Sequence, residues 1–119
     1  MNNEAEIYTI LEKVISQSKA SWISLSGGLD SSIIGHFMKD KNPNSLTIIA
    51  KDFVGDDLTY SQIISKHLDI PLEISYVSTE QILDGIKNTI KILKNFNDIE
   101  IRNSVVMYMS LETLHKRYV

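Results

Sequence analysis

The chain has 119 residues, a formal net charge of −3 and no cysteine. This length favours a single domain, and 43% hydrophobic with 23% charged residues is ordinary for a water-soluble globular protein. The lack of cysteine excludes disulfides, thiolate metal sites and cysteine-based sulfur transfer. The net negative charge argues against a nucleic-acid partner, because neutralising phosphates requires clustered lysines and arginines.

The sequence also carries no sign of a membrane partner. No apolar run reaches the length of a membrane span, and the polar, acidic stretch at residues 1–6 does not resemble a secretory signal. We therefore expect a cytoplasmic protein.

Helical and strand-like patterns alternate along the chain. Apolar residues at helical spacing predict helices, and short runs rich in strand formers predict strands. A capping box formed by Ser78 and Gln81 predicts a further helix start. In chain order the predicted elements are helix 4–18, strand 21–25, helix 30–39, strand 46–50, helix 58–68, strand 72–77, a helix whose apolar stripe runs over 82–93, and helix 100–117.

This order predicts the α/β fold class. Strands that alternate with helices imply a parallel sheet with right-handed crossovers, flanked by helices. About three strands are expected in the chain.

The first predicted strand leads into the segment Ser26–Ser32, which reads SGGLDSS, and a helix follows at once. Gly27 and Gly28 allow the backbone to approach a phosphate closely, and successive N–H groups form an anion-binding nest. The positive end of the helix dipole points at the same place. The hydroxyls of Ser26, Ser31 and Ser32 add further donors, so the segment predicts a phosphate-binding loop.

Asp30 is the unusual residue of this loop, because a carboxylate repels a phosphate unless a cation lies between them. One interpretation is that Asp30 holds Mg²⁺ that bridges phosphate oxygens. The other is that Asp30 caps the N-terminus of its helix, a frequent use of aspartate. The two roles can coexist.

Two better-known nucleotide loops are excluded by the spacing. The segment lacks the Gly-Lys-Ser/Thr ending of a Walker loop, and it is not the GxGxxG fingerprint of dinucleotide-binding folds.

The segment Ser26–Ser32 matches the signature of PP-loop, or N-type, ATP pyrophosphatases, and the chain resembles most the synthetase domain of asparagine synthetase. Leu25 precedes the loop as in that family. Residues 45–48 resemble its second strand. The stretch 96–108 resembles its segment with Ile-Arg, a small residue, Ser, and then Met-Tyr in a helix.

The resemblance implies a Rossmann-like, three-layer α/β/α fold of the adenine nucleotide alpha hydrolase type, with ATP and Mg²⁺ as cofactors. It implies that ATP contacts Leu25, the loop Ser26–Ser32 (including Leu29) and Ile48, and that Asp30 contacts the metal. A small carboxylate substrate would attack the α-phosphorus, releasing pyrophosphate, and an amine would then displace AMP. Arg102 is a candidate contact to substrate or phosphate, or else an exposed arginine near a helix start.

The resemblance covers residues from about 20 onward, and we expect residues 1–119 to form one PP-loop domain equivalent to the N-terminal half of the complete family fold. The family's second active-site loop has no counterpart here. Without its neighbouring strand, the strand at 21–25 would be an exposed edge, so we expect a homo-oligomer or a partner chain that covers this edge. Two alternatives to an AMP-forming ligase stay open: a nucleotide-binding module or remnant without turnover, and a tRNA-modifying PP-loop protein.

Overall fold

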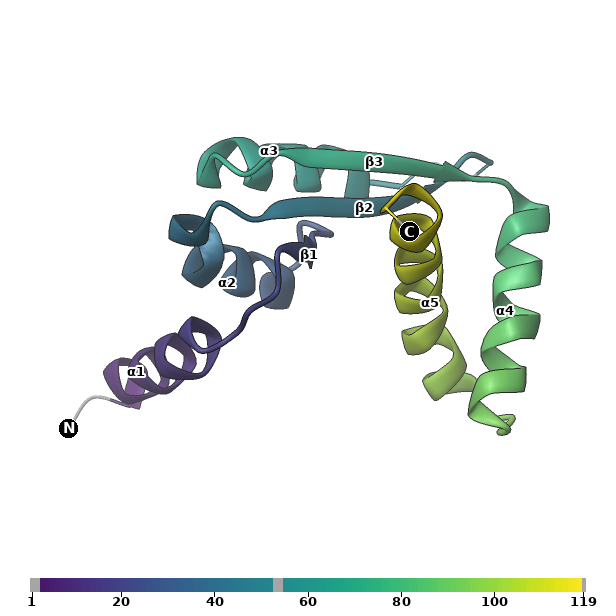
Figure 1. Ribbon diagram of the computed structural model, residues 1–119, viewed down its shortest axis with the longest axis horizontal. Coiled ribbons are helices and arrows are strands. Elements are labelled where there is room, and N and C mark those ends of the chain that lie inside the picture. The colour runs from purple at the N-terminus through teal and green to yellow at the C-terminus, as the bar shows by residue number, and fades with distance from the viewer. Residues whose placement is uncertain (1–2, 53–54, 119) are drawn as a thin grey trace. The chain divides into compact units, whose positions relative to one another are not determined.

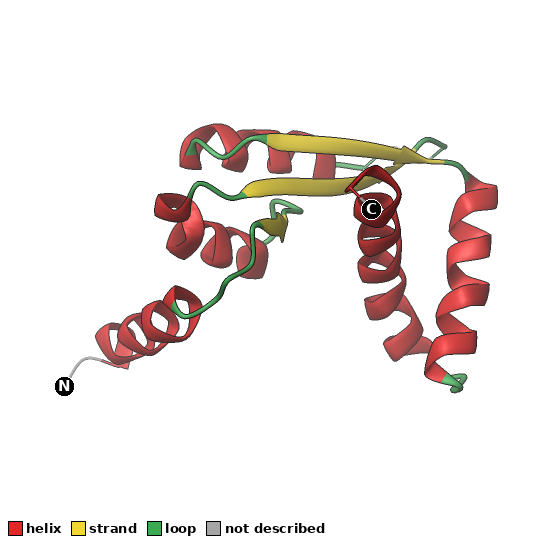
Figure 2. Ribbon diagram, viewed as in Figure 1, coloured by secondary structure: helices red, strands yellow, loops and turns green. Residues whose placement is uncertain are grey.

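A computed structural model describes residues 3–52 and 55–118 (Figures 1 and 2). Helices and strands alternate as the sequence predicts. The elements are α1 (Asn3–Ser16), β1 (Trp22–Ser24), α2 (Leu29–Met38), the short 3₁₀ helix η1 (Lys39–Lys41), β2 (Asn44–Ala50), α3 (Asp57–Leu68), β3 (Leu72–Val77), α4 (Thr79–Leu93) and α5 (Asp98–Tyr118).

The three strands form one parallel sheet in the order β1-β2-β3. Strand β1 pairs with β2 in parallel, with Trp22 opposite Asn44 and Ser24 opposite Leu46. The predicted α/β class with a Rossmann-like parallel sheet is therefore confirmed. In this order β1 has a strand on one side, which agrees with the expected edge position.

The chain divides into two compact units. The first comprises residues 1–46 and 56–73, and the second comprises residues 47–55 and 74–119. The boundaries fall within β2 and within β3, so each unit contains a part of both strands.

The first unit has a small apolar core formed by β1 and the C-terminal ends of α2 and α3. Ile23, Met38 and Ile70 are buried together, and Ile15 and Leu68 pack against them. Helices α2 and α3 approach closely at Gly35, where an added Cβ would lie 2.9 Å from Cδ1 of Leu68. This packing holds the C-terminal half of α2 against β1 and α3.

The C-terminal end of α1 is tied to the first unit by a lysine. The ammonium group of Lys41 donates hydrogen bonds to the carbonyl oxygens of Ser16 at 2.6 Å and Ser18 at 2.7 Å. A cation at this end is favourable, because the last carbonyls of a helix lack intrahelical partners and carry the negative end of the dipole.

The second unit contains the pair of helices α4 and α5, which run side by side (Figure 1). The predicted capping box at the start of α4 is present: Gln81 N–H donates to Ser78 Oγ, and Ser78 N–H donates to Gln81 Oε1. Gly85 allows the contact with α5, since its added Cβ would lie 3.1 Å from Cγ of Met109.

Three helices end in residues with left-handed backbone that are not glycine. They are Asn42 after η1, Asp69 after α3 and Lys94 after α4, with φ of 53°, 54° and 53°. Each of them donates its N–H to a carbonyl of the preceding turn, which is the usual way to satisfy a helix end.

Among the residues that the structure describes, no helix is long and apolar enough to cross a membrane.

Candidate phosphate-binding site

The segment Ser26–Ser32 connects β1 to α2 at the carboxyl end of the strand, which is where parallel α/β sheets bind ligands. Leu25 enters the segment fully buried, and its N–H donates to Leu46 O at 3.0 Å. This continues the β1–β2 ladder by one residue and fixes the point at which the loop leaves the sheet.

Gly27 is required by both its backbone and its surroundings. Its φ is +83°, and an added Cβ would lie 2.5 Å from Cβ of Tyr60 and 2.8 Å from N of Ser61. Ser61 is fully buried, so the start of α3 presses directly against the loop. The sequence motif predicts a glycine turn at this position. The structure adds that α3 supplies the surface against which Gly27 turns.

The first turn of α2 presents free backbone donors. The helix begins at Leu29, its N-cap is Gly28, and no side chain caps it. The first hydrogen bond of the helix is from Ser32 N to Gly28 O, at 3.1 Å. Within residues 3–52 and 55–118, no acceptor takes the N–H groups of Leu29, Asp30 and Ser31. Unsatisfied N–H groups at a helix start are the donors that bind phosphate oxygens.

The suggestion that Asp30 caps its helix is wrong, since Gly28 occupies the N-cap position. Asp30 lies instead in the first turn and is exposed, and it makes no hydrogen bond or ion pair with any other described residue. A carboxylate there has favourable dipole energy and is available to a cation. The described residues include no group of three or more His, Cys, Asp or Glu side chains that would hold a metal unaided.

The loop serines bond to the loop itself. Ser31 Oγ lies 3.1 Å from Ser26 Oγ and accepts the Ser26 N–H at 3.2 Å. Ser32 Oγ donates to Gly28 O at 2.6 Å. In this conformation the hydroxyl proton of Ser32 is used internally, so the donors most available to a ligand are backbone N–H groups rather than the three hydroxyls that the sequence suggests.

Besides Leu25, two predicted site residues lie outside the loop, and both are in the second unit. Ile48 is half-buried in β2. Arg102 lies on α5, where its guanidinium is 3.1 Å from the Asp98 carboxylate and both side chains are about three-quarters exposed. Their contacts with ATP therefore stay predictions.

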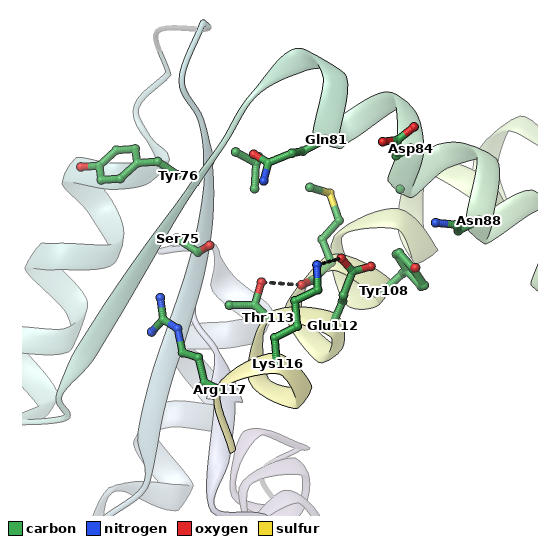
Figure 3. Close-up of a pocket in the computed structure, with 13 residues that line it drawn as sticks. Ser75, Tyr76, Gln81, Asp84, Asn88, Tyr108, Glu112, Thr113, Lys116 and Arg117 are labelled. Carbon is green, nitrogen blue, oxygen red and sulfur yellow. Dashed lines mark hydrogen bonds and ion pairs between the residues drawn. The ribbon is translucent and has the colours of Figure 1, made fainter. Parts of the chain in front are cut away.

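The second unit has a polar pocket of about 370 Å³ that the sequence did not indicate (Figure 3). It lies between β3, α4 and α5, and Tyr108, Glu112 and Lys116 line its α5 side. These three residues recur every four positions, so the spacing visible in the sequence could have indicated a shared helix face. Ser110, on a different face of α5, has a buried hydroxyl without a partner among the described residues.

Hydrogen bonding along this row shifts three pKa values. The hydrogen bond to Glu112 raises the pKa of the Tyr108 hydroxyl. The Lys116 ammonium, 2.8 Å from Glu112 Oε1, lowers the pKa of the Glu112 carboxyl, and the same bond raises the pKa of Lys116. All three shifts favour the charge states in which the phenol and the ammonium donate to the carboxylate.

A parallel α/β sheet with this glycine-rich loop at the end of β1 defines the PP-loop class of ATP-utilising domains. Within that class, the chain belongs to the asparagine synthase family, because the family model described as Asparagine synthase matches residues 17–119. This confirms the resemblance drawn from the loop and the two stretches that follow it.

A solved structure supports the fold. The NH3-dependent NAD synthetase from Campylobacter jejuni subsp. jejuni NCTC 11168, in complex with the nitrate ion, matches with a TM-score of 0.55 and 18% identity. The match covers 90% of the present chain and 47% of that chain, so the present chain spans about half the length of this structural relative. Comparison with curated proteins gives no match.

Proposed function

We propose that the chain binds ATP, with the pyrophosphate portion held at Ser26–Ser32. The observation that carries this proposal is the uncapped start of α2, where three adjacent N–H groups find no acceptor among the described residues and lie beside a glycine with φ of +83°. Such a site contributes fixed dipoles where phosphate charge accumulates, without reorganisation on binding.

Mg²⁺ fits this site through Asp30. Magnesium usually takes one or two protein carboxylates, with phosphate oxygens and water completing its shell. Asp30 offers one exposed carboxylate in the first turn of α2, which is unpaired within the part of the chain that the structure describes. Bound Mg²⁺ would neutralise phosphate charge, and the carboxylate of Asp30 would hold it next to the backbone donors.

As a member of the asparagine synthase family, the chain would use ATP to activate a small carboxylate. A carboxylate oxygen bonds to the α-phosphorus while the bond to the bridging oxygen breaks, giving an acyl-adenylate and pyrophosphate. An amine or ammonia then attacks the acyl carbon, AMP leaves, and an amide forms. The chain's own contribution is positioning and charge neutralisation by the loop, with Arg102 as a candidate contact to phosphate or substrate.

A binding module without turnover is the second candidate. It agrees with the described residues, among which no group of three or more His, Cys, Asp or Glu side chains could hold a metal. Both functions share the ATP site and differ in the release of pyrophosphate.

Calorimetric titration with ATP and an assay for pyrophosphate, AMP and amide test these proposals. The assay mixture contains ATP, Mg²⁺, aspartate and ammonia. Binding with pyrophosphate release is expected for the ligase. Binding without release supports the module. A well-folded protein that does not bind ATP would contradict the site itself.

Asp30→Asn distinguishes a metal contact from a general effect on the loop. With Mg²⁺ present we expect about tenfold weaker ATP binding, equivalent to roughly 1.4 kcal/mol. With Mg²⁺ removed by a chelator we expect the variant to bind ATP at least as tightly as the wild type, because a charge that repels phosphate is gone. Equal weakening under both conditions would refute the metal role.

A further inference from the structure

Helix α1 has an apolar surface that its own unit covers only in part. With about 100° between successive residues, its apolar side chains occupy an arc of roughly 160°. Tyr8, Leu11 and Ile15 lie on the side that packs against α2 and the core, where the Tyr8 ring meets the Phe37 ring at a centroid distance of 4.8 Å. This accounts for half of the arc.

The other half of the arc is exposed. Ile7, Ile10 and Val14 are 57%, 55% and 62% exposed, and α1 contains no fully buried residue. The three positions follow heptad spacing, with Ile7 and Val14 at a positions and Ile10 at the d position between them. Such a strip is typical of a helix that pairs with another helix.

The charges beside the strip select the partner and its direction. Glu6 and Lys13 occupy the two g positions that flank the strip. In an antiparallel pair of identical helices the g rows face each other, so a pair centred on Ile10 brings Glu6 of each copy next to Lys13 of the other. The opposite flank, with Leu11 at its e position, carries no basic residue, so a parallel pair would leave Glu6 and Lys13 without oppositely charged partners.

We propose that α1 is a self-association surface, on which a second copy of this chain docks its own α1 in antiparallel orientation about a twofold axis at Ile10. The contact is isologous: the strip of Ile7, Ile10 and Val14 packs on its equivalent, and two symmetric Glu6–Lys13 pairs fix the direction. The Lys41 contacts at the end of α1 keep the helix anchored to its own unit. This inference concerns assembly and does not depend on ATP binding.

Sedimentation or light scattering over a micromolar to millimolar range tests the assembly. The wild type is expected to dimerise with rising concentration. Ile10→Glu places two carboxylates at the twofold axis and should weaken the dimer more than about tenfold. Ala5→Glu adds the same charge on the opposite, exposed face of α1 and should leave the dimer unchanged.

The Glu6–Lys13 pairs give a second test, with surface substitutions that should leave folding unchanged. Glu6→Lys alone and Lys13→Glu alone each create two repulsive contacts and should weaken self-association about fivefold. An equimolar mixture of these two variants restores both attractive pairs, and so does the double variant. Both should therefore dimerise at least as well as the wild type, and the effects should shrink at high salt.

Three results would overturn the proposal. A wild type that is monomeric at all concentrations, with Ile10→Glu lowering its melting temperature, would show that the strip is covered within one chain. Self-association that withstands Ile10→Glu would place the interface elsewhere, for example at the β1 edge. Failure of the mixed charge variants to associate would exclude the antiparallel arrangement.

Discussion

Gly27 combines a left-handed backbone with direct contact against α3, and either alone would disfavour a side chain. Gly27→Ala must move backbone atoms of Tyr60 and Ser61, because the added Cβ has no flexible neighbour to displace. We expect a loss of about 1–3 kcal/mol of unfolding free energy and loss of ATP binding. Chemical denaturation and calorimetric titration measure the two effects.

Gly55→Ala is the matched control for this prediction. An added Cβ at Gly55 meets no atom of the other described residues within 4 Å. The change is expected to be nearly neutral for stability and for ATP binding. If Gly27→Ala proved equally neutral, the close approach of α3 to the loop would be refuted.

The Tyr108, Glu112 and Lys116 row predicts a stability maximum at intermediate pH. The lowered pKa of Glu112 means that its contribution is present above its unfolded pKa and is lost as the pH falls through the folded value. The raised pKa values of Lys116 and Tyr108 mean that their contributions are present below the unfolded values and are lost as the pH rises through the folded ones. Because Lys116 is exposed and Tyr108 and Glu112 are only half-buried, the effect is small and sensitive to salt.

NMR titration of the Glu112 carboxyl checks this assignment. In Lys116→Gln the pKa of Glu112 should rise toward its ordinary value, since the lysine is the largest cause of its lowering. Lys91→Gln removes a lysine of α4 that takes no part in the row and should leave the Glu112 titration unchanged. An unchanged Glu112 pKa in the Lys116 variant would contradict the network.

At the scale of elements, the start of α4 is held by the reciprocal bonds of Ser78 and Gln81. Ser78→Ala leaves N–H groups of the first turn without a partner and should lower the unfolding free energy by about 1 kcal/mol. Ser78→Asp retains an acceptor at the N-cap and should recover most of the loss. Urea denaturation of the three proteins is the measurement, and equal midpoints would rule out the cap as a stabilising contact.

Most of the helices and strands could be predicted from local sequence patterns, because each depends on short-range periodicity. The predicted strand 72–77 agrees with β3, Leu72–Val77, and the capping box marks the start of α4 correctly. Helix α5 begins two residues before its predicted start, where the Asn97 side chain accepts the N–H groups of Ile99 and Glu100. Strand β1 is limited to Trp22–Ser24, since its length depends on pairing with β2 rather than on its own composition.

The candidate site was predictable as a motif but not as a set of donors. The string SGGLDSS indicates a phosphate loop, and the structure shows its glycine turn and uncapped helix start. What the string cannot reveal is how hydroxyls and N–H groups share their bonds. The serines hold the loop together, and the position of the N-cap depends on where the chain leaves β1, which residues of β2 and α3 determine.

At the scale of the whole molecule, ATP binding is expected to raise the thermal stability of the fold that contains the loop. A ligand present at about 100 times its dissociation constant adds roughly 2.7 kcal/mol if it binds the folded state alone. For a chain of this size that corresponds to a rise of several degrees in melting temperature. Thermal denaturation with ATP and Mg²⁺ should show this rise, and Gly27→Ala, although less stable, should show none.

Three helices end in non-glycine residues with a left-handed backbone, and such residues lower the unfolding free energy of the fold. A residue with a Cβ in this conformation costs roughly 1 kcal/mol relative to glycine. Lys94 is exposed, with φ of 53°, so glycine at this position relieves strain without opening a cavity. Lys94→Gly therefore offers an engineering route to a more heat-resistant form of the chain, one that touches neither the loop nor the surface of α1 and so suits crystallisation and ligand screening.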